Sequence, residues 1–411
     1  MQRPVHRRRV FYIPGYDPIH PRRYREMYRR EGAEQALISD YEISLTPKTT
    51  KGPYGWHVLG DMDGMQTTAD FEVLVWSDIV RDSMSNSISA TYAQLLRTAW
   101  IYIGTGTLFR LMKLRKGPVI AALYPVAMLV LQLLVAVVVG WGVTQGIGLF
   151  SGVLDGALNT VIQLGSLLFG LVAVVVVLRW FRARDNRLMA YYLMHDYAYS
   201  AHLHGAIPAD LNTRLAEFGD RIAAELQQDV DEVLIVGHSS GAHLAVTVLA
   251  DLIRAGRVPN DGPALGFLSL GQVVPMVSFL PDADQLRGDL QYLSARDELA
   301  WVDVSAPGDG CAFALCDPVT VSGVAPKDKK WPLVFSAAFS QTLSSERWKK
   351  LKRRYFRLHF QYLCAFDRPK DYDYFRITAG PKTLAARYDG RPPSKSRINV
   401  AVSKYTSVRT L

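Results

Sequence analysis

The stretch Val233-Leu234-Ile235-Val236-Gly237-His238-Ser239-Ser240-Gly241 decides the expected fold of this chain. Its first four residues are apolar and largely β-branched, which is typical of a buried parallel strand. Residues 242–248 have the pattern of a helix, and a sharp turn from strand to helix leaves almost no room for side chains at its two ends. Glycine occupies both ends here, at Gly237 and Gly241. The sequence therefore predicts a strand, a tight turn and a helix, with Ser239 at the apex of the turn.

A serine held in such a turn is a candidate nucleophile, provided that a base can take its proton. On this type of scaffold the partners follow the serine in the order acid, then histidine. Two histidines follow Ser239 in the chain: His243, which is too close in sequence to act as the base, and His359. By elimination we expect His359 to be the base, within a short aromatic run that could form the last strand and its exit.

The acid that orients the histidine should follow a strand that lies between Ser239 and His359. The apolar run 300–306 leads directly into Pro307-Gly308-Asp309-Gly310, so Asp309 is the first choice. Asp317 is the second choice, and Asp303 is expected inside the strand. A Gly-Asp-Gly turn also occurs without any catalytic role, and this alternative stays open.

A transition-state oxyanion needs hydrogen-bond donors, which are commonly the N–H after the nucleophile and one from an early loop. Ser240 would supply the first of these donors. The strand expected at Arg9–Ile13 is followed by Pro14-Gly15-Tyr16, so Gly15 or Tyr16 could supply the second. The alternative is an ordinary Pro-Gly turn.

By these motifs and their order, the chain resembles the α/β-hydrolases of the serine esterase and lipase kind. The resemblance implies an α/β fold with a mostly parallel sheet flanked by helices, and a Ser239–His359–Asp309 triad that cleaves an ester-type substrate through an acyl-enzyme. This chemistry needs no metal or organic cofactor. Pro14-Gly15-Tyr16 replaces the common His-Gly oxyanion motif, and more than 200 residues separate it from the turn at Ser239, which implies a large insertion. There are two alternatives: an acyltransferase on the same fold, or a catalytically inactive membrane scaffold or regulatory protein in which the inserted region carries the function.

The insertion carries two long apolar stretches, at 118–143 and 158–178, and Asp155 is the one charged residue between Lys116 and Arg179. About 20 apolar residues suffice for a helix to cross a bilayer, so we predict a transmembrane hairpin. Arginine and lysine flank both outer ends, while the connecting segment 141–154 has none. The positive-inside rule then predicts a two-span integral membrane protein, with the catalytic domain in the cytoplasm and the connection outside. We assign it to a bacterial inner membrane.

The remaining composition agrees with this placement. The first thirty residues are rich in arginine and show no signal peptide, and the three cysteines suit a reducing compartment. The net charge of +9 is concentrated in two basic clusters, which we expect to contact anionic lipid headgroups beside a substrate that is a small molecule or a lipid. No nucleic-acid-binding motif accompanies these clusters, so no nucleic acid partner is expected. The basic clusters are Arg7–Arg9 with Arg22, Arg23, Arg25, Arg29 and Arg30, and Arg347–Arg354.

The expected domain organisation follows from these assignments. Residues 1–115 form the first part of the hydrolase domain and include an interfacial helix near 92–112, and residues 116–180 form the hairpin. Residues 181–370 form the second part, which carries the catalytic residues. Beyond Asp367 the sequence is polar and rich in glycine, proline and basic residues, so residues 371–411 are expected to be a peripheral tail.

Overall fold

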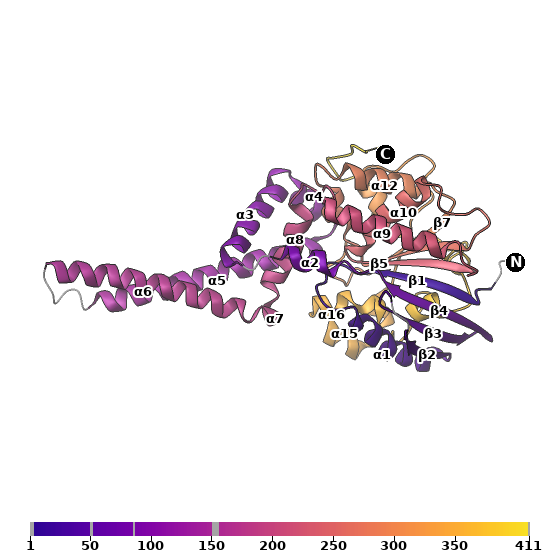
Figure 1. Cartoon of the computed structure of the whole chain (residues 1–411), viewed down its shortest axis with the longest axis horizontal. Coiled ribbons are helices and arrows are strands. Elements are labelled where there is room, and N and C mark those ends of the chain that lie inside the picture. Colours follow the sequence, from indigo (N-terminus) through magenta and orange to yellow (C-terminus); the bar gives the residue numbers. More distant parts are fainter. Residues whose placement is uncertain (1–3, 50–51, 85–86, 150–155, 410–411) are drawn as a thin grey trace. The chain divides into compact units, whose positions relative to one another are not determined.

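The structure is a computed structural model that describes residues 4–49, 52–84, 87–149 and 156–409. Its centre is an eight-stranded sheet with the order β2-β3-β4-β1-β5-β6-β7-β8 (Figure 1). The strands β2, β3 and β4 pair antiparallel, and every other pairing from β4 to β8 is parallel. The expected α/β class with a mostly parallel sheet is therefore confirmed. The strands are β1 (Arg7–Ile13), β2 (Glu42–Pro47), β3 (Gly55–Met62), β4 (Met65–Val73), β5 (Glu232–His238), β6 (Ala264–Leu270), β7 (Leu299–Ser305) and β8 (Leu333–Ser336).

Helices lie between β1 and β2 and between successive strands from β4 onward. Those of the first half are α1 (Arg22–Ser39), α2 (Ser77–Ser83), α3 (Ile88–Gly104), α4 (Thr107–Leu114), α5 (Lys116–Gly148), α6 (Ala157–Arg182), α7 (Asp185–Leu188), α8 (Ala190–Ala201) and α9 (Ala209–Glu225). Those of the second half are α10 (Gly241–Arg254), α11 (Val274–Ser278), α12 (Asp284–Ser294), α13 (Pro318–Val321), α14 (Phe339–Thr342), α15 (Ser345–Leu351), α16 (Tyr355–His359), the 3-10 turn η2 (Gln361–Leu363), α17 (Tyr374–Ala379) and α18 (Leu384–Arg387).

The chain divides into two compact units. The sheet unit comprises Met1–Arg81, Tyr102–Val119 and Leu203–Leu411, and the helical unit comprises Asp82–Ile101 and Ile120–His202. The helical unit is larger than the predicted hairpin of residues 116–180, because most of α3 and all of α7 and α8 belong to it. Leu95, Leu129, Tyr191 and Met194 share a buried cluster, so α3 and α8 pack on α5 around Leu129 within one unit.

Two layers of helices enclose the sheet of the sheet unit (Figure 1). Helices α9, α10 and α12 cover one face, and α1, α15 and α16 cover the other. The central strand β5 is buried along its whole length, as expected for a parallel strand covered on both faces. The edge strand β2 instead has no fully buried residue. Burial therefore decreases from the middle of the sheet to this edge, and the turn after β5 lies in the best-packed part of the sheet unit.

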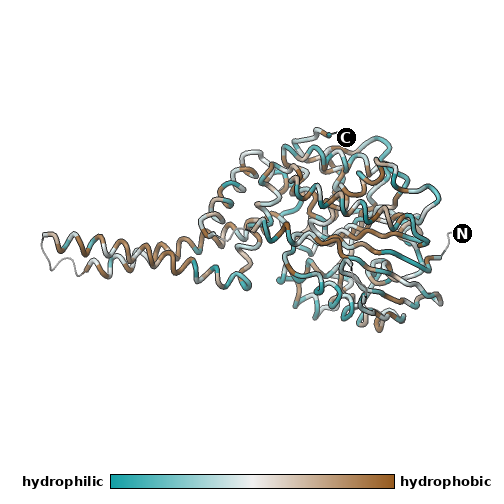
Figure 2. The backbone as a smooth tube through the Cα atoms, viewed as in Figure 1, coloured by the Kyte–Doolittle hydropathy of each residue, from teal (hydrophilic) through white to brown (hydrophobic). Residues whose placement is uncertain are grey.

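Helices α5 and α6 are long and apolar enough to cross a membrane, and only 22% and 17% of their most apolar windows are buried. Both are hydrophobic over most of their length (Figure 2). Within the helical unit they touch at glycines: a Cβ on Gly170 would lie 2.8 Å from the Gly140 oxygen, and Thr144 donates a hydrogen bond to the Ser166 oxygen across the pair. The two helices therefore form a closely packed pair. The predicted connection at 141–154 begins inside α5, and Asp155 and residues 150–154 lie outside the described residues.

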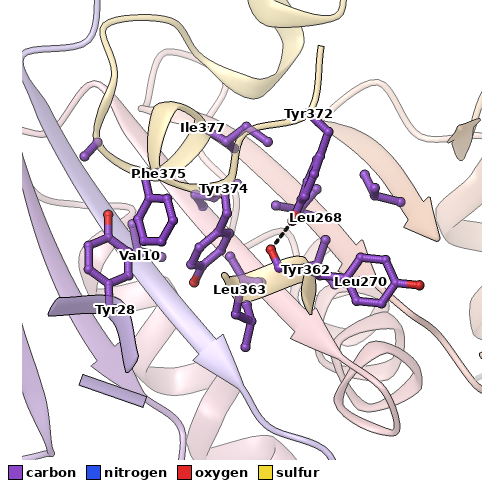
Figure 3. Close-up of a cluster of buried hydrophobic side chains, with 14 of the residues drawn as sticks. Val10, Tyr28, Leu268, Leu270, Tyr362, Leu363, Tyr372, Tyr374, Phe375 and Ile377 are labelled. Atoms are coloured by element: carbon purple, nitrogen blue, oxygen red, sulfur yellow. Dashed lines mark hydrogen bonds between the residues drawn. The ribbon is translucent and has the colours of Figure 1, made fainter. Parts of the chain in front are cut away.

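The expectation of a peripheral tail at 371–411 is wrong for its first part. Tyr372, Tyr374, Phe375 and Ile377 are buried and belong to the large core cluster on one face of the sheet (Figure 3). Phe375 lies 4.9 Å from the Tyr28 ring, centroid to centroid, and so contacts α1. The sequence did not mark these four side chains as core residues, because their neighbours in the chain are polar. The described residues after α18, 388–409, form no helix.

Candidate active site

Ser239 lies in the turn between β5 and α10, as the sequence predicts. Its φ angle is +57°, a left-handed conformation that costs free energy for a residue with a side chain. The Ser239 N–H donates to the Leu270 oxygen at the end of β6 (2.9 Å), which ties the strained turn to the neighbouring strand. Such strain is typical of a serine displayed at the apex of a strand-to-helix turn.

The two glycines that flank this turn are required by close backbone contacts. A Cβ on Gly237 would lie 2.7 Å from the Gly241 oxygen, because the turn brings the two ends together. A Cβ on Gly241 would lie 2.0 Å from the Ile13 oxygen at the end of β1, and real Cβ atoms do not approach that closely. The glycine spacing therefore reflects how tightly α10 starts against β1.

The early loop that was expected to hold oxyanion donors lies beside Ser239. A Cβ on Gly15 would lie 3.0 Å from the Ser239 Cβ and 3.4 Å from its Oγ, so the Gly15 backbone is next to the hydroxyl. Ser240 is buried and immediately precedes α10, whose N-terminal end favours negative charge. Tyr16 is also buried, but its ring packs edge-on against Trp76. The loop and the turn are thus brought together from positions more than 200 residues apart.

Asp309 and His359 are hydrogen-bonded. The His359 Nδ1–H donates to the Asp309 Oδ2 (2.7 Å), and both side chains are buried. Asp309 Oδ1 accepts from the Cys311 N–H (2.9 Å), so both carboxylate oxygens have donors. With Nδ1 bound to the carboxylate, Nε2 is the ring nitrogen that can accept a proton. His359 ends the short helix α16, so the expectation that its aromatic run forms the last strand is wrong; the last strand is β8.

The two other aspartates considered from the sequence have structural contacts instead. Asp317 caps helix α13, where its carboxylate accepts from the N–H groups of Val319 and Thr320, and it pairs with Lys329 at 2.6 Å. Asp303 lies inside β7, as predicted, and accepts from the Ser269 hydroxyl (2.7 Å). Of the three aspartates, Asp309 is the one that reaches His359.

Ser239 and His359 both contact the chain at the end of β6. A Cβ on Gly271, which follows β6, would lie 3.1 Å from the His359 Cε1, and the preceding Leu270 accepts the Ser239 N–H. In the part of the chain that the structure describes, the Ser239 hydroxyl makes no hydrogen bond to His359, and the His359 Nε2 is buried without a partner. The hydrogen bond between a nucleophilic serine and its histidine is often long or poorly aligned before a substrate binds.

Two further residues position the pair, and sequence reasoning missed both. The His238 Nε2–H donates to the His359 backbone oxygen (3.0 Å), and burial, with a smaller effect of His359, lowers the pKa of His238 to about 3. Tyr362 donates its O–H to the Asp309 Oδ2 (3.0 Å) and accepts the Ala306 N–H. Burial, followed by the charge of Asp309, raises the pKa of Tyr362 well above its ordinary value. Two features of the sequence could have indicated these residues. His238 lies between the glycines that flank the turn, and Tyr362 lies three residues after His359.

The loop that carries Asp309 is covered by neighbouring segments of the sheet unit. A Cβ on Gly308 would lie 2.6 Å from the Trp348 ring, and one on Gly310 would lie 2.7 Å from the Tyr355 ring. The chain just before the first apolar span also contacts this loop, because Gly117 packs on Gly310 and the Arg115 Nε donates to the Ala314 oxygen (2.7 Å). The acid loop therefore packs against residues that immediately precede α5's apolar stretch.

Some residues of the basic clusters form ion pairs within the protein. Arg8 is 1% exposed and pairs with buried Glu232 at 2.6 Å, so it cannot reach a lipid headgroup, and this part of the expectation is wrong. Arg347 contacts Glu31, Glu34 and Asp367. Lys349, Arg353 and Arg354 are exposed, so their contact with lipid headgroups stays a prediction.

Asp309, Cys311 and His359 are also the residues that could hold a metal ion, because each offers one ligand atom and these atoms lie within 4.8 Å of one another. Cys311, Cys316 and Cys364 form no disulfide. Comparisons with protein-family models, with curated proteins and with solved structures found no match for this chain.

Proposed function

We propose that this chain is a membrane-anchored serine hydrolase of the α/β-hydrolase kind. The observation that carries the proposal is the buried Asp309–His359 hydrogen bond beside the strained turn of Ser239. A carboxylate that holds Nδ1 leaves Nε2 as a base, which is what a serine nucleophile requires. Asp309 and His359 are fifty residues apart in sequence, so their pairing is not a product of local chain geometry.

The reaction follows from these groups. The Ser239 Oγ attacks the carbonyl carbon of an ester while His359 Nε2 takes the hydroxyl proton. The N–H groups of Ser240 and Gly15 stabilise the oxyanion, a contribution worth about 3–4 kcal/mol for one donor in known enzymes. His359 then protonates the leaving alcohol, and an acyl-enzyme remains. Water attacks this ester, His359 takes one proton from the water, and Ser239 recovers its proton as the carboxylic acid leaves.

The substrate is proposed to be an acyl ester that partitions to a membrane surface. Helices α5 and α6 would anchor the protein, and by the positive-inside rule the basic flanks favour a sheet unit in the cytoplasm. Gly117 and Arg115, just before the apolar stretch, pack on the acid loop of the site. The acid loop thus lies next to the start of α5, which favours a lipid or another membrane-associated ester as the substrate of a bacterial inner-membrane enzyme.

Labelling of the detergent-solubilised protein with a fluorophosphonate probe tests the proposal, because such probes react with activated serines. Wild type should label, and Ser239→Ala and His359→Ala should both lose labelling by about a thousandfold or more. Ser240→Ala is the matched control, because it keeps the backbone N–H and removes a neighbouring hydroxyl. Absence of labelling in a folded wild type, or unchanged labelling in His359→Ala, would reject the mechanism and favour a scaffold role.

A further inference from the structure

The cluster of Asp309, Cys311 and His359 has properties that the hydrolase mechanism does not use. Its three ligand atoms, a carboxylate oxygen, a thiol sulfur and an imidazole nitrogen, lie within 4.8 Å of one another. The cysteine thiol takes no part in the proposed reaction. The His359 Nδ1 and the Asp309 Oδ2 are 2.7 Å apart and their side chains are 8% and 0% exposed, so a metal ion held by both atoms would replace the buried hydrogen bond that joins them.

The chemistry of these three ligands selects the kind of metal. Thiolate and imidazole are preferred by Zn²⁺, whereas Mg²⁺ and Ca²⁺ prefer oxygen ligands alone. Zinc–ligand bonds of about 2.0–2.3 Å bring ligand atoms to about 3.5 Å from one another in a tetrahedral site. Cys311 is only half-buried, so rotation of its side chain can shorten the separation. Three protein ligands leave the fourth position for water.

We propose that Zn²⁺ binds to Asp309, Cys311 and His359 and reversibly inhibits the enzyme. On binding, the Cys311 thiol loses its proton to solvent, the His359 proton moves from Nδ1 to Nε2, and zinc–sulfur, zinc–oxygen and zinc–nitrogen bonds form at Cys311, Asp309 and Nδ1. No electron is transferred. With a proton on Nε2, His359 can no longer accept the Ser239 proton. The inhibition part rests on the proposed function, whereas the metal site itself does not.

Isothermal titration of ZnCl₂ into full-length Ser239→Ala protein tests the site independently of catalysis. This host should bind Zn²⁺, and adding Cys311→Ser or Cys311→Ala should weaken the affinity by about tenfold or more, since a ligand is lost. Cys364→Ser is the matched control, because this cysteine lies outside the cluster, and it should leave the affinity unchanged. MgCl₂ should not bind. Equal affinities for the Cys311 and Cys364 variants, or no binding of Zn²⁺ at all, would overturn the site.

Fluorophosphonate labelling of wild type then tests inhibition. Zn²⁺ should slow labelling and EDTA should restore it, and in Cys311→Ser the inhibiting concentration should rise about tenfold when each variant is compared with its own metal-free rate. Faster labelling with Zn²⁺, or equal sensitivity of both proteins, would overturn the inhibitory role. If wild type does not label while calorimetry shows a Cys311-dependent site, the proposed function fails and the metal site stands.

Discussion

At the scale of single residues, the site depends on which partner each side chain finds. Asp309, Asp317 and Asp303 share one chemistry, but only Asp309 contacts the histidine. Asp317 caps helix α13 and pairs with Lys329, and Asp303 accepts a hydrogen bond from Ser269. A carboxylate orients an imidazole only by direct hydrogen bonding, so the role of each aspartate follows from its contact rather than from its distance to Ser239 along the chain.

Replacement of Asp309 by asparagine should therefore show whether Asp309 or Asp317 orients His359. Asp309→Asn keeps the shape of the site but favours the wrong imidazole tautomer, and we expect kcat to fall by about 10³–10⁴-fold with little change in folding. Asp317→Asn should instead lower thermal stability through loss of its cap and charge, an effect of about 1 kcal/mol, with kcat nearly retained. Measured ester hydrolysis and melting curves of the two variants check this, and the opposite pattern would reassign the acid to Asp317.

Asp303 provides a pH-dependent prediction. Burial raises its pKa to about 7, whereas the unfolded chain should titrate near 3.8, so the folded state binds more protons between these values. Stability from this group is fully present below the unfolded pKa and is lost as pH rises through 7. Asp303→Asn cannot titrate, so its melting temperature relative to wild type should rise from pH 5 to pH 8. Exposed Asp229→Asn is the control, and a relative melting temperature that falls over this range would contradict the assignment.

At the scale of helices and strands, the sequence predicts what depends on local pattern. The strand before Ser239, the early strand at Arg9–Ile13 and the two apolar helices follow from periodicity and length, and the structure contains them. The sequence ranks Asp309 before Asp317 but does not decide between them, because both follow β7 in turns and the difference lies in tertiary contacts. His359 lies in a helix of five residues, which is too short to produce a helical period.

The contact between α5 and α6 gives a prediction at the same scale. Gly170→Leu should weaken the hairpin, because a Cβ there would lie 2.1 Å from the Thr144 Oγ1 and 2.8 Å from the Gly140 oxygen. Overpacking of this kind costs about 1–3 kcal/mol. Gly165→Leu is the matched control in α6, since no described atom lies within 4 Å of its Cβ position. Melting temperatures in one detergent should fall for the first variant only, and equal behaviour would mean that the helices do not pack at Gly170.

At the scale of the whole chain, segments from both ends build the core that supports the site. Tyr28 of α1 packs against Phe375 of α17, and the Tyr372 O–H donates to the Tyr362 oxygen (2.7 Å; Figure 3). Tyr362 in turn bonds to Asp309. A chain of contacts therefore connects the C-terminal segment to Asp309, which explains why this polar-looking part of the sequence contains buried aromatic residues.

Phe375→Ala tests this connection. The side chain is fully buried, and its removal leaves a cavity between α17 and α1 that should cost about 3–5 kcal/mol of stability. Val400→Ala is the control, because Val400 is 61% exposed and its truncation should change stability by less than about 0.5 kcal/mol. The melting temperature and the rate of fluorophosphonate labelling should both fall in Phe375→Ala, since Tyr362 loses packing support next to Asp309. If Phe375→Ala melts and labels like Val400→Ala, the C-terminal segment is peripheral after all and the acid is held without it.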